Sequence, residues 1–171
     1  MEYTQHYDSP LGRILLAADD KGLTGLWFEG GKYAGRGLSA DAQARESPYF
    51  DAARRWLDVY FAGRDPGFTP PLHLTGTAFC NRVAELLLEI PYGHTVTYGD
   101  LARRLAQERG GGASAQAVGG AVARNPILLI MPCHRVIGAN GGLTGYSGGL
   151  WRKRALLENE IGDGSLSHLS K

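Results

Sequence analysis

The sequence predicts a small α/β domain, made of an antiparallel sheet and one helix, followed by a mainly α-helical domain that contains a helix-turn-helix of winged-helix type. Three observations predict this fold: alternating apolar runs near the N-terminus, a helical apolar repeat after Ser47, and helical periodicity from Thr77 onward. We assign residues 1–68 to the first domain, 69–75 to a linker, 76–162 to the second domain and 163–171 to a flexible tail.

The first domain begins with three predicted strands that form an antiparallel meander. They cover Tyr3–Tyr7, Gly12–Ala18 and Leu23–Phe28, with turn-forming residues between them. Ser47 is a good helix N-cap, and the proline after it suits the first helical position. Residues 65–74 include three prolines, so we expect a linker with at most one edge strand.

Helical patterns dominate the second domain. An apolar stripe starts at Thr77, and the spacing of Thr97 and Asp100 resembles a capping box that opens a second helix. Ser114 is the expected N-cap of a third helix, which Asn125-Pro126 ends. The second and third helices together predict the helix-turn-helix.

The last predicted helix covers about residues 149–161. Its apolar and basic residues suggest two faces, with Leu150, Leu156 and Leu157 inward and Arg152, Lys153 and Arg154 outward.

The composition excludes several classes of protein. The chain has 171 residues, a net charge of +1 and only two cysteines, which favours a reducing compartment over a disulfide scaffold. Neither a membrane-spanning run nor a signal peptide is recognisable, and the histidines lack metal-ligand spacing, so we expect no membrane association and no metal. A charge of +1 excludes DNA binding by electrostatics alone, although basic residues between Arg103 and Arg154 permit a modest basic face.

The most informative stretch brings a thiol and an imidazole together after a buried apolar run. If residues 127–131 are extended, Cys133 and His134 point to opposite faces unless the chain turns, and Pro132 favours such a turn. A thiol beside a base is one way to make a thiolate nucleophile at neutral pH. The alternative is a small buried cysteine next to a surface histidine.

The string Pro132-Cys133-His134-Arg135-Val136 is preceded by Asn125-Pro126 and followed by Gly145-Tyr146-Ser147-Gly148-Gly149. Together these segments resemble the active-site region of the O6-alkylguanine-DNA alkyltransferases, also called methylated-DNA–protein-cysteine methyltransferases. The resemblance runs from about residue 76 to about residue 160. It implies irreversible transfer of an alkyl group from O6-alkylguanine, and from O4-alkylthymine, in duplex DNA to a cysteine. It also implies one turnover per molecule, no cofactor, a monomer, and a cytoplasmic protein of prokaryotic type.

The resemblance also assigns roles to individual residues. Cys133 is the acceptor, His134 takes its proton through a water, Glu160 stabilises the imidazolium, and Asn125 ties the helix-turn-helix to the active-site turn. For the base, the expected contacts are the Tyr98 hydroxyl at N3, the Ser147 N–H at O6, the carbonyls of Cys133 and Val136 at the exocyclic amine, and a pocket wall at Tyr146. Gly148 is a further expected substrate-binding residue.

The third predicted helix is unusually thin for a DNA-reading helix, because alanine and glycine fill most of its positions. Small residues suit either the minor groove or close helix–helix packing, and the resemblance favours the minor groove. The expected DNA contacts are Ser114, Ala115, Gln116, Ala117, Val122, Arg124 and Arg135. Gln116 stands where the family pattern has an arginine that fills the gap left by the extruded base, so we expect altered base extrusion.

Three other functions are compatible with parts of this pattern. A non-catalytic protein that only binds alkylated lesions would lack the acceptor cysteine, whereas Cys133 is present. A cysteine hydrolase would bring its histidine from a distant segment. A helix-turn-helix regulator would have no use for a thiol at a buried turn.

Overall fold

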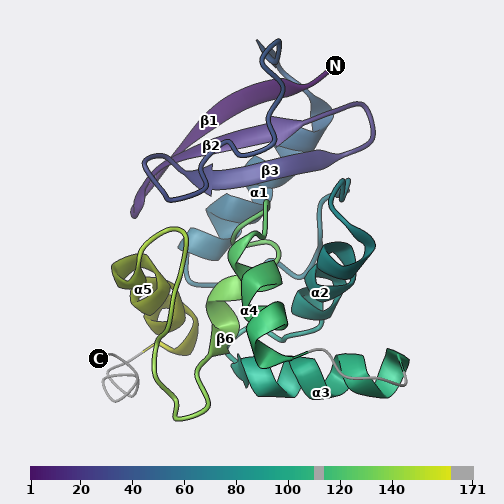
Figure 1. The fold of residues 1–171 in the computed structure, drawn as a ribbon. Coiled ribbons are helices and arrows are strands. Elements are labelled where there is room, and N and C mark those ends of the chain that lie inside the picture. Colours follow the sequence, from purple (N-terminus) through teal and green to yellow (C-terminus); the bar gives the residue numbers. More distant parts are fainter. Residues whose placement is uncertain (110–113, 163–171) are drawn as a thin grey trace. The chain divides into compact units, whose positions relative to one another are not determined.

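The computed structural model describes residues 1–109 and 114–162 of the chain, and the expected tail at 163–171 lies outside them. The chain forms two compact units (Figure 1): residues 1–75 with the short segment 126–130, and residues 76–125 with the chain from 131 onward. The first unit therefore includes both the predicted first domain and the predicted linker. The return of 126–130 to the first unit has no counterpart in the sequence prediction.

The first unit contains a four-stranded sheet of order β3-β2-β1-β4. Its strands are β1 (Tyr3–Ser9), β2 (Gly12–Ala18), β3 (Leu23–Phe28) and β4 (Gln43–Ala44). The three long strands form the expected antiparallel meander, but β4 pairs with β1 in parallel, so the sheet is mixed. The short β4 lies in a polar, glycine-rich stretch whose composition predicts only a loop.

Helix α1 (Pro48–Phe61) packs against β1 and β2 (Figure 1). Ser47 caps it as expected, because its hydroxyl accepts a hydrogen bond from the Tyr49 N–H at 3.2 Å. The core of this unit consists of the buried faces of β2, β3 and α1.

Two further segments pair with β3. The Leu23 N–H donates to the Pro71 carbonyl at 2.9 Å, so part of the predicted linker is an edge bridge of the sheet. The Leu128 N–H donates to the Leu26 carbonyl at 2.9 Å, but the chain then turns at Leu129, which has a positive φ of 69°. The stretch 127–131 is therefore not a continuous strand, and the chain has already turned before it reaches Pro132.

The second unit is mainly helical, as predicted. Its elements are α2 (Ala78–Leu88), β5 (Val96–Thr97), α3 (Tyr98–Arg109), α4 (Ala115–Ala123), the 3-10 turn η1 (Cys133–Arg135), β6 (Val136–Ile137) and α5 (Leu150–Ile161). Helix α4 packs on both α2 and α3, and β5 pairs with β6 in parallel.

The predicted caps of α3 and α4 form. The Thr97 N–H donates to the Asp100 carboxylate at 2.9 Å, and the Asp100 N–H donates to the Thr97 hydroxyl at 3.0 Å, which is a complete capping box. The Ser114 hydroxyl accepts from the Ala117 N–H at 3.0 Å.

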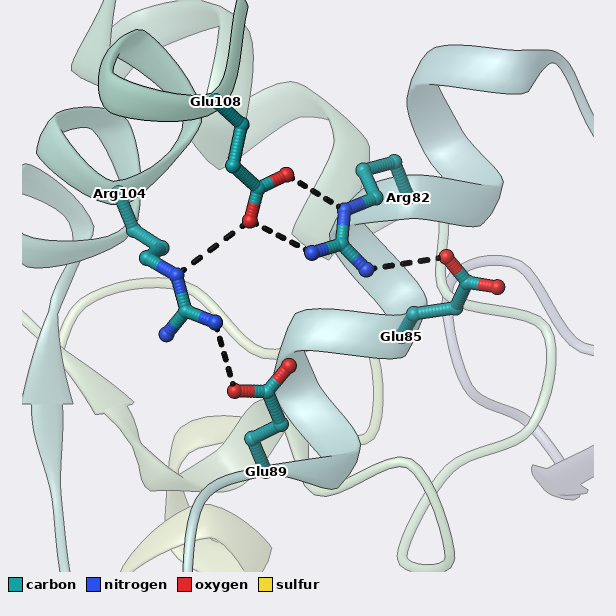
Figure 2. A network of polar contacts seen from close by, with 5 residues as sticks. All are labelled: Arg82, Glu85, Glu89, Arg104 and Glu108. Carbon is teal, nitrogen blue, oxygen red and sulfur yellow. Dashed lines mark hydrogen bonds and ion pairs between the residues drawn. The ribbon is translucent and has the colours of Figure 1, made fainter.

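A surface network of ion pairs connects α2 with α3 (Figure 2). The Arg82 guanidinium contacts the carboxylates of Glu85 and Glu108. The Arg104 guanidinium lies 3.3 Å from the Glu108 carboxylate and 3.0 Å from the Glu89 carboxylate. The positive charge of Arg104 is therefore partly neutralised by neighbouring carboxylates, which lowers the net positive charge of the basic face that the sequence permits.

The buried and exposed faces of helix α5 differ from the predicted ones at two residues. Leu156 and Leu157 are buried as expected, but Leu150 is 48% exposed and Lys153 is fully buried. Residues 153, 156, 157 and 160 follow the i, i+3, i+4, i+7 spacing of one helical face, so Lys153 shares the inward face with the leucines.

No helix among residues 1–109 and 114–162 is both long and apolar enough to cross a membrane. Within the same ranges, no group of three or more histidine, cysteine, aspartate or glutamate side chains is arranged to hold a metal ion.

Candidate active site

The chain turns at the thiol and the imidazole, as predicted. Pro132 (φ −81°, ψ 66°) is the centre of a tight turn, because the Cys133 N–H donates to the Met131 carbonyl at 2.8 Å. A 3-10 turn over Cys133–Arg135 follows at once. Cys133 is 4% exposed and His134 is completely buried.

The Glu160 carboxylate, from α5, joins three parts of this unit. Its Oε2 lies 2.5 Å from Nε2 of His134, and its Oε1 accepts hydrogen bonds from Nε of Arg135 at 2.8 Å and from the Gly93 N–H at 2.9 Å. The Glu160 and His134 side chains are both inaccessible to solvent. Each carboxylate oxygen therefore has its own partner in the active-site turn, and the turn before β5 is tied to the same group.

This pairing determines the protonation of Glu160. Burial alone would raise the pKa of its carboxyl, but the hydrogen bond from His134 and the charge of Arg135 outweigh it and lower the pKa to about 2. Glu160 is therefore ionised at neutral pH.

The same pairing determines the tautomer of His134. Burial lowers the pKa of His134, which keeps the imidazole neutral. An ionised carboxylate only accepts hydrogen bonds, so Nε2 of His134 carries the hydrogen and Nδ1 is the basic nitrogen.

The surroundings of Cys133 favour the protonated thiol over the thiolate. Burial raises the pKa of Cys133 to about 11, against the opposing effects of a hydrogen bond from the Asn125 side chain and the charge of Lys153. In the free protein burial therefore opposes formation of a thiolate, and the neighbouring imidazole as proton acceptor stays a prediction.

Asn125 lies between the end of α4 and the active-site turn. It is buried, and its amide donates to the Met131 carbonyl at 2.7 Å. Because α4 ends at Ala123, this bond connects the end of that helix to the residue before Pro132.

The residues expected to hold the base lie in the same unit. Tyr98 begins α3, and its hydroxyl donates to the Thr144 carbonyl at 3.3 Å. Tyr146, Ser147 and Gly148 form a turn closed by a hydrogen bond from the Gly149 N–H to the Tyr146 carbonyl at 2.9 Å. Burial raises the pKa of both tyrosine hydroxyls, and the negative charge that Cys133 can carry raises it further, so both rings lie near the thiol.

Two expected DNA contacts are wrong. Arg135 is buried, because its guanidinium pairs with Glu160 and donates to the Ile90 carbonyl at 2.7 Å. Val122 is 5% exposed and lies on the inward face of α4 with Val118 and Ala121. Neither side chain is available to a partner at the surface.

The other expected DNA contacts are exposed. They are the cap and first turn of α4, with a position beyond its end: Ser114, Ala115, Gln116, Ala117 and Arg124. A methyl group added at Gly119 would lie 3.8 Å from the Tyr98 ring, and one added at Gly120 would lie 3.6 Å from the Arg124 guanidinium. These are ordinary contact distances, so close packing within the unit does not require either glycine.

Lys153 is the residue of this region that the sequence interpretation missed. Its ammonium lies inside the unit and donates to the carbonyls of Val136, Thr144 and Gly145. The helical spacing of Lys153 to Leu156, Leu157 and Glu160 could have placed it, but the flanking arginines made an exposed basic patch the simpler interpretation.

Comparison with known proteins gives consistent matches over the whole chain. Residues 78–162 match the family described as the 6-O-methylguanine DNA methyltransferase DNA-binding domain, and residues 3–74 match its ribonuclease-like domain. The chain is 44% identical to a methylated-DNA–protein-cysteine methyltransferase of Methanosarcina acetivorans, over 92% of this chain and 97% of that one. It is 40% identical to the protein of the same name from Haemophilus influenzae, over 92% and 86% of the two chains.

Solved structures agree with these matches. The chain resembles Mycobacterium tuberculosis OGT in complex with DNA, with a TM-score of 0.80 and 42% identity over 94% of this chain and 93% of that one. It also resembles the O6-methylguanine-DNA methyltransferase of Pyrococcus kodakaraensis, with a TM-score of 0.66 and 27% identity over 94% and 99% of the two chains.

Proposed function

The chain belongs to the family of methylated-DNA–protein-cysteine methyltransferases, and from this premise we propose that Cys133 is its alkyl acceptor, in a single-turnover repair of O6-alkylguanine in duplex DNA. The family supplies the reaction, direct transfer of an alkyl group from DNA to a protein cysteine, and DNA as the partner. The choice of residues and the way in which DNA is bound are our proposals.

One observation carries the assignment of Cys133. It is a buried thiol one residue before a neutral histidine, and that histidine donates to an ionised, buried carboxylate. This is the order of groups in a carboxylate–histidine–nucleophile relay. The other cysteine, Cys80, is only half-buried, and its sulfur lies 3.9 Å from the Arg124 guanidinium; among the described residues no histidine hydrogen bond to Cys80 is found.

In the proposed reaction, the Cys133 thiol gives its proton to Nδ1 of His134 through a water as its sulfur approaches the alkyl carbon. The sulfur–carbon bond forms while the carbon–O6 bond breaks, and the electron pair of the broken bond leaves with guanine. The base then takes up one proton, so the net change replaces the thiol hydrogen with the alkyl group. A thioether has no easy route back to a thiol, and each molecule therefore acts once.

The base must leave the duplex to meet a buried thiol, so we propose that it is flipped into a pocket beside Cys133. The Tyr98 hydroxyl at N3 and the Ser147 N–H at O6 stabilise the charge on the leaving guanine. Tyr146 and Gly148 form a wall of the pocket, and the carbonyls of Cys133 and Val136 accept from the exocyclic amine.

Helix α4 is proposed to enter the minor groove. Its exposed face carries small residues, and the structure gives no internal packing reason for Gly119 and Gly120 to be glycine, which supports an external reason. Gln116 is proposed to fill the space that the flipped nucleotide leaves, with a hydrogen bond to the unpaired cytosine but no positive charge. We propose further that the protein works as a monomer on DNA in a prokaryotic cytoplasm, and that O4-alkylthymine is a second substrate.

Intact-mass measurement after incubation with an O6-methylguanine duplex tests the central proposal. The expected result is a mass gain of one methyl group in place of one hydrogen, located on Cys133 by peptide analysis. The Cys80→Ser variant is the matched control and should react like the natural chain.

Two outcomes would contradict the proposal. If the Cys133→Ser variant still cleared the lesion, the acceptor would be another residue. If the natural chain bound the duplex tightly without a change in mass, the protein would be a lesion-binding protein without transferase activity.

A further inference from the structure

The ammonium group of Lys153 lies in a position that lysine rarely occupies. The side chain is fully buried, and Nζ donates to the carbonyls of Val136 at 2.6 Å, Thr144 at 2.8 Å and Gly145 at 3.3 Å. These three bonds use the three hydrogens of an ammonium group. Within the described residues Lys153 has no ion pair, so its charge meets carbonyl dipoles and the Tyr98 ring rather than a carboxylate.

The three carbonyls belong to the two segments that flank the proposed pocket. Val136 follows the active-site turn directly and opens β6, whereas Thr144 and Gly145 precede the Tyr146 turn. The Thr144 carbonyl also accepts from the Tyr98 hydroxyl. A single ammonium therefore holds together the strand after the acceptor cysteine, the pocket wall and the residue that opens α3.

The charge of Lys153 differs from the other buried charge nearby. Arg135 is paired with the Glu160 carboxylate, so its field is largely cancelled at a distance. The charge of Lys153 is not cancelled in this way, and it lowers the pKa of Cys133 against the larger effect of burial.

We propose that Lys153 is a positioning residue for the alkyl transfer: it holds Val136, Thr144 and Gly145 around the acceptor cysteine, and its charge favours the negative charge that forms on Cys133 and on the leaving base. This inference rests on the proposed function of Cys133.

The groups that face Lys153 set how its charge acts. They are Cys133 and His134 from the active-site turn and the Tyr98 ring, whose centre is 5.9 Å from Nζ. Burial lowers the pKa of Lys153 to about 8, and a negative charge on Cys133 raises it. Ionisation of the thiol therefore reinforces the charge that stabilises it.

The test measures the thiol pKa and the transfer rate in a Cys80→Ser background, where Cys133 is the single cysteine. The rate of iodoacetamide alkylation against pH gives the thiol pKa, and single-turnover reaction with an O6-methylguanine duplex gives the transfer rate. In Lys153→Met, which keeps the length of the stem without its charge, we expect the thiol pKa to rise by about one unit. The transfer rate should fall about tenfold or more, with DNA affinity unchanged.

Lys153→Arg separates charge from position. Arginine keeps the charge, but its planar fork cannot donate to the same three carbonyls, so the thiol pKa should stay at its natural value while transfer slows. Arg154→Met removes a charge from the outer face of the same helix, where Arg154 pairs with Glu158, and it should change neither quantity.

Three results would overturn the inference. The first is a folded Lys153→Met with the natural thiol pKa and transfer rate. If Lys153→Met does not fold, Lys153→Arg decides: a natural transfer rate would exclude the positioning role, and a raised thiol pKa would exclude the charge effect. A background protein that gains no methyl group would instead refute the proposed function, while the thiol pKa comparison would still report on Lys153.

Discussion

At the scale of single residues, the site depends on the two oxygens of one carboxylate, each of which binds a different side chain. Oε2 of Glu160 meets His134 and Oε1 meets Arg135, and the arginine keeps the carboxylate ionised without competing for the histidine. We therefore propose that Arg135 supports the active site through Glu160. A buried charge of this kind is costly to leave without its partner.

Replacement of Arg135 tests this reassignment. Arg135→Met leaves Glu160 without its cationic partner and should destabilise the protein by roughly 3 kcal/mol in urea unfolding. Transfer should slow in the folded fraction, because the carboxylate no longer fixes the His134 tautomer. DNA affinity of the folded protein should stay within the error of the natural chain, and a selective loss of affinity with normal stability would restore the DNA-binding role.

The Cys133 thiol gives a second prediction at this scale. Its pKa is raised to about 11, so the protonated form dominates below that pH. Alkylation of the free Cys80→Ser protein by iodoacetamide should therefore accelerate about tenfold per pH unit from pH 7 to pH 10. A plateau near pH 7 would mean that the free protein already holds a thiolate.

At the scale of elements, α4 contains two glycines next to the exposed face that we propose enters the minor groove. Gly120 lies three and four positions after Ala117 and Gln116, so it shares their exposed face. Glycine inside a helix costs about 0.5–1 kcal/mol relative to alanine, and nothing inside the unit requires it here. The cost is consistent with a face that must approach DNA closely.

Gly120→Ala should separate stability from binding. We expect a gain of about 0.5–1 kcal/mol in unfolding free energy, because alanine is the better helix former. Affinity for an undamaged duplex should fall, because the methyl group thickens the face that enters the groove. Higher stability with unchanged affinity would show that this face of α4 does not touch DNA.

At the scale of the whole molecule, the chain forms two units, and the first unit includes a segment that interrupts the second in the sequence. Residues 126–130 leave the second unit, pair with β3 in the first, and return immediately before Cys133. Unfolding of either unit therefore disturbs the chain on one side of the active-site turn, and we expect the two units to unfold together.

The Glu160 cluster predicts how the stability of the whole chain depends on pH. The pKa of Glu160 is lowered from an ordinary 4.5 to about 2, so its stabilisation is complete above about pH 4.5 and is lost as the pH falls through 2. The upper bound on this loss is roughly 3 kcal/mol. Urea unfolding between pH 6 and pH 2 measures it.

Glu160→Gln supplies the control for the acid prediction, because its amide cannot titrate. This variant should be less stable at pH 6 and should show a correspondingly flatter dependence on pH. An equal dependence in both proteins would place the acid-sensitive group elsewhere.

Local chemistry explains why so much of the fold was predictable from the sequence. Ser47, Thr97 with Asp100 and Ser114 act on backbone groups within three residues, so their caps form wherever the helix forms. Likewise, Pro132 turns the chain through its own restricted φ. For these reasons the three long strands, α1, the helices of the second unit and the turn at Cys133 were all predictable.

The tertiary structure alone decided where charges lie and what they meet. Arg135 and Lys153 are charged residue types that usually lie at the surface. Packing instead places Arg135 against Glu160 and Lys153 among three carbonyls. The parallel pairing of β4 and the return of 126–130 likewise depend on partners far along the chain. By itself the sequence determined local conformation and the identity of the reactive groups. Only the tertiary structure decided how burial shifts the pKa of the thiol and which groups pair with each buried charge. The reason is that desolvation and long-range pairing depend on neighbours in space rather than in sequence.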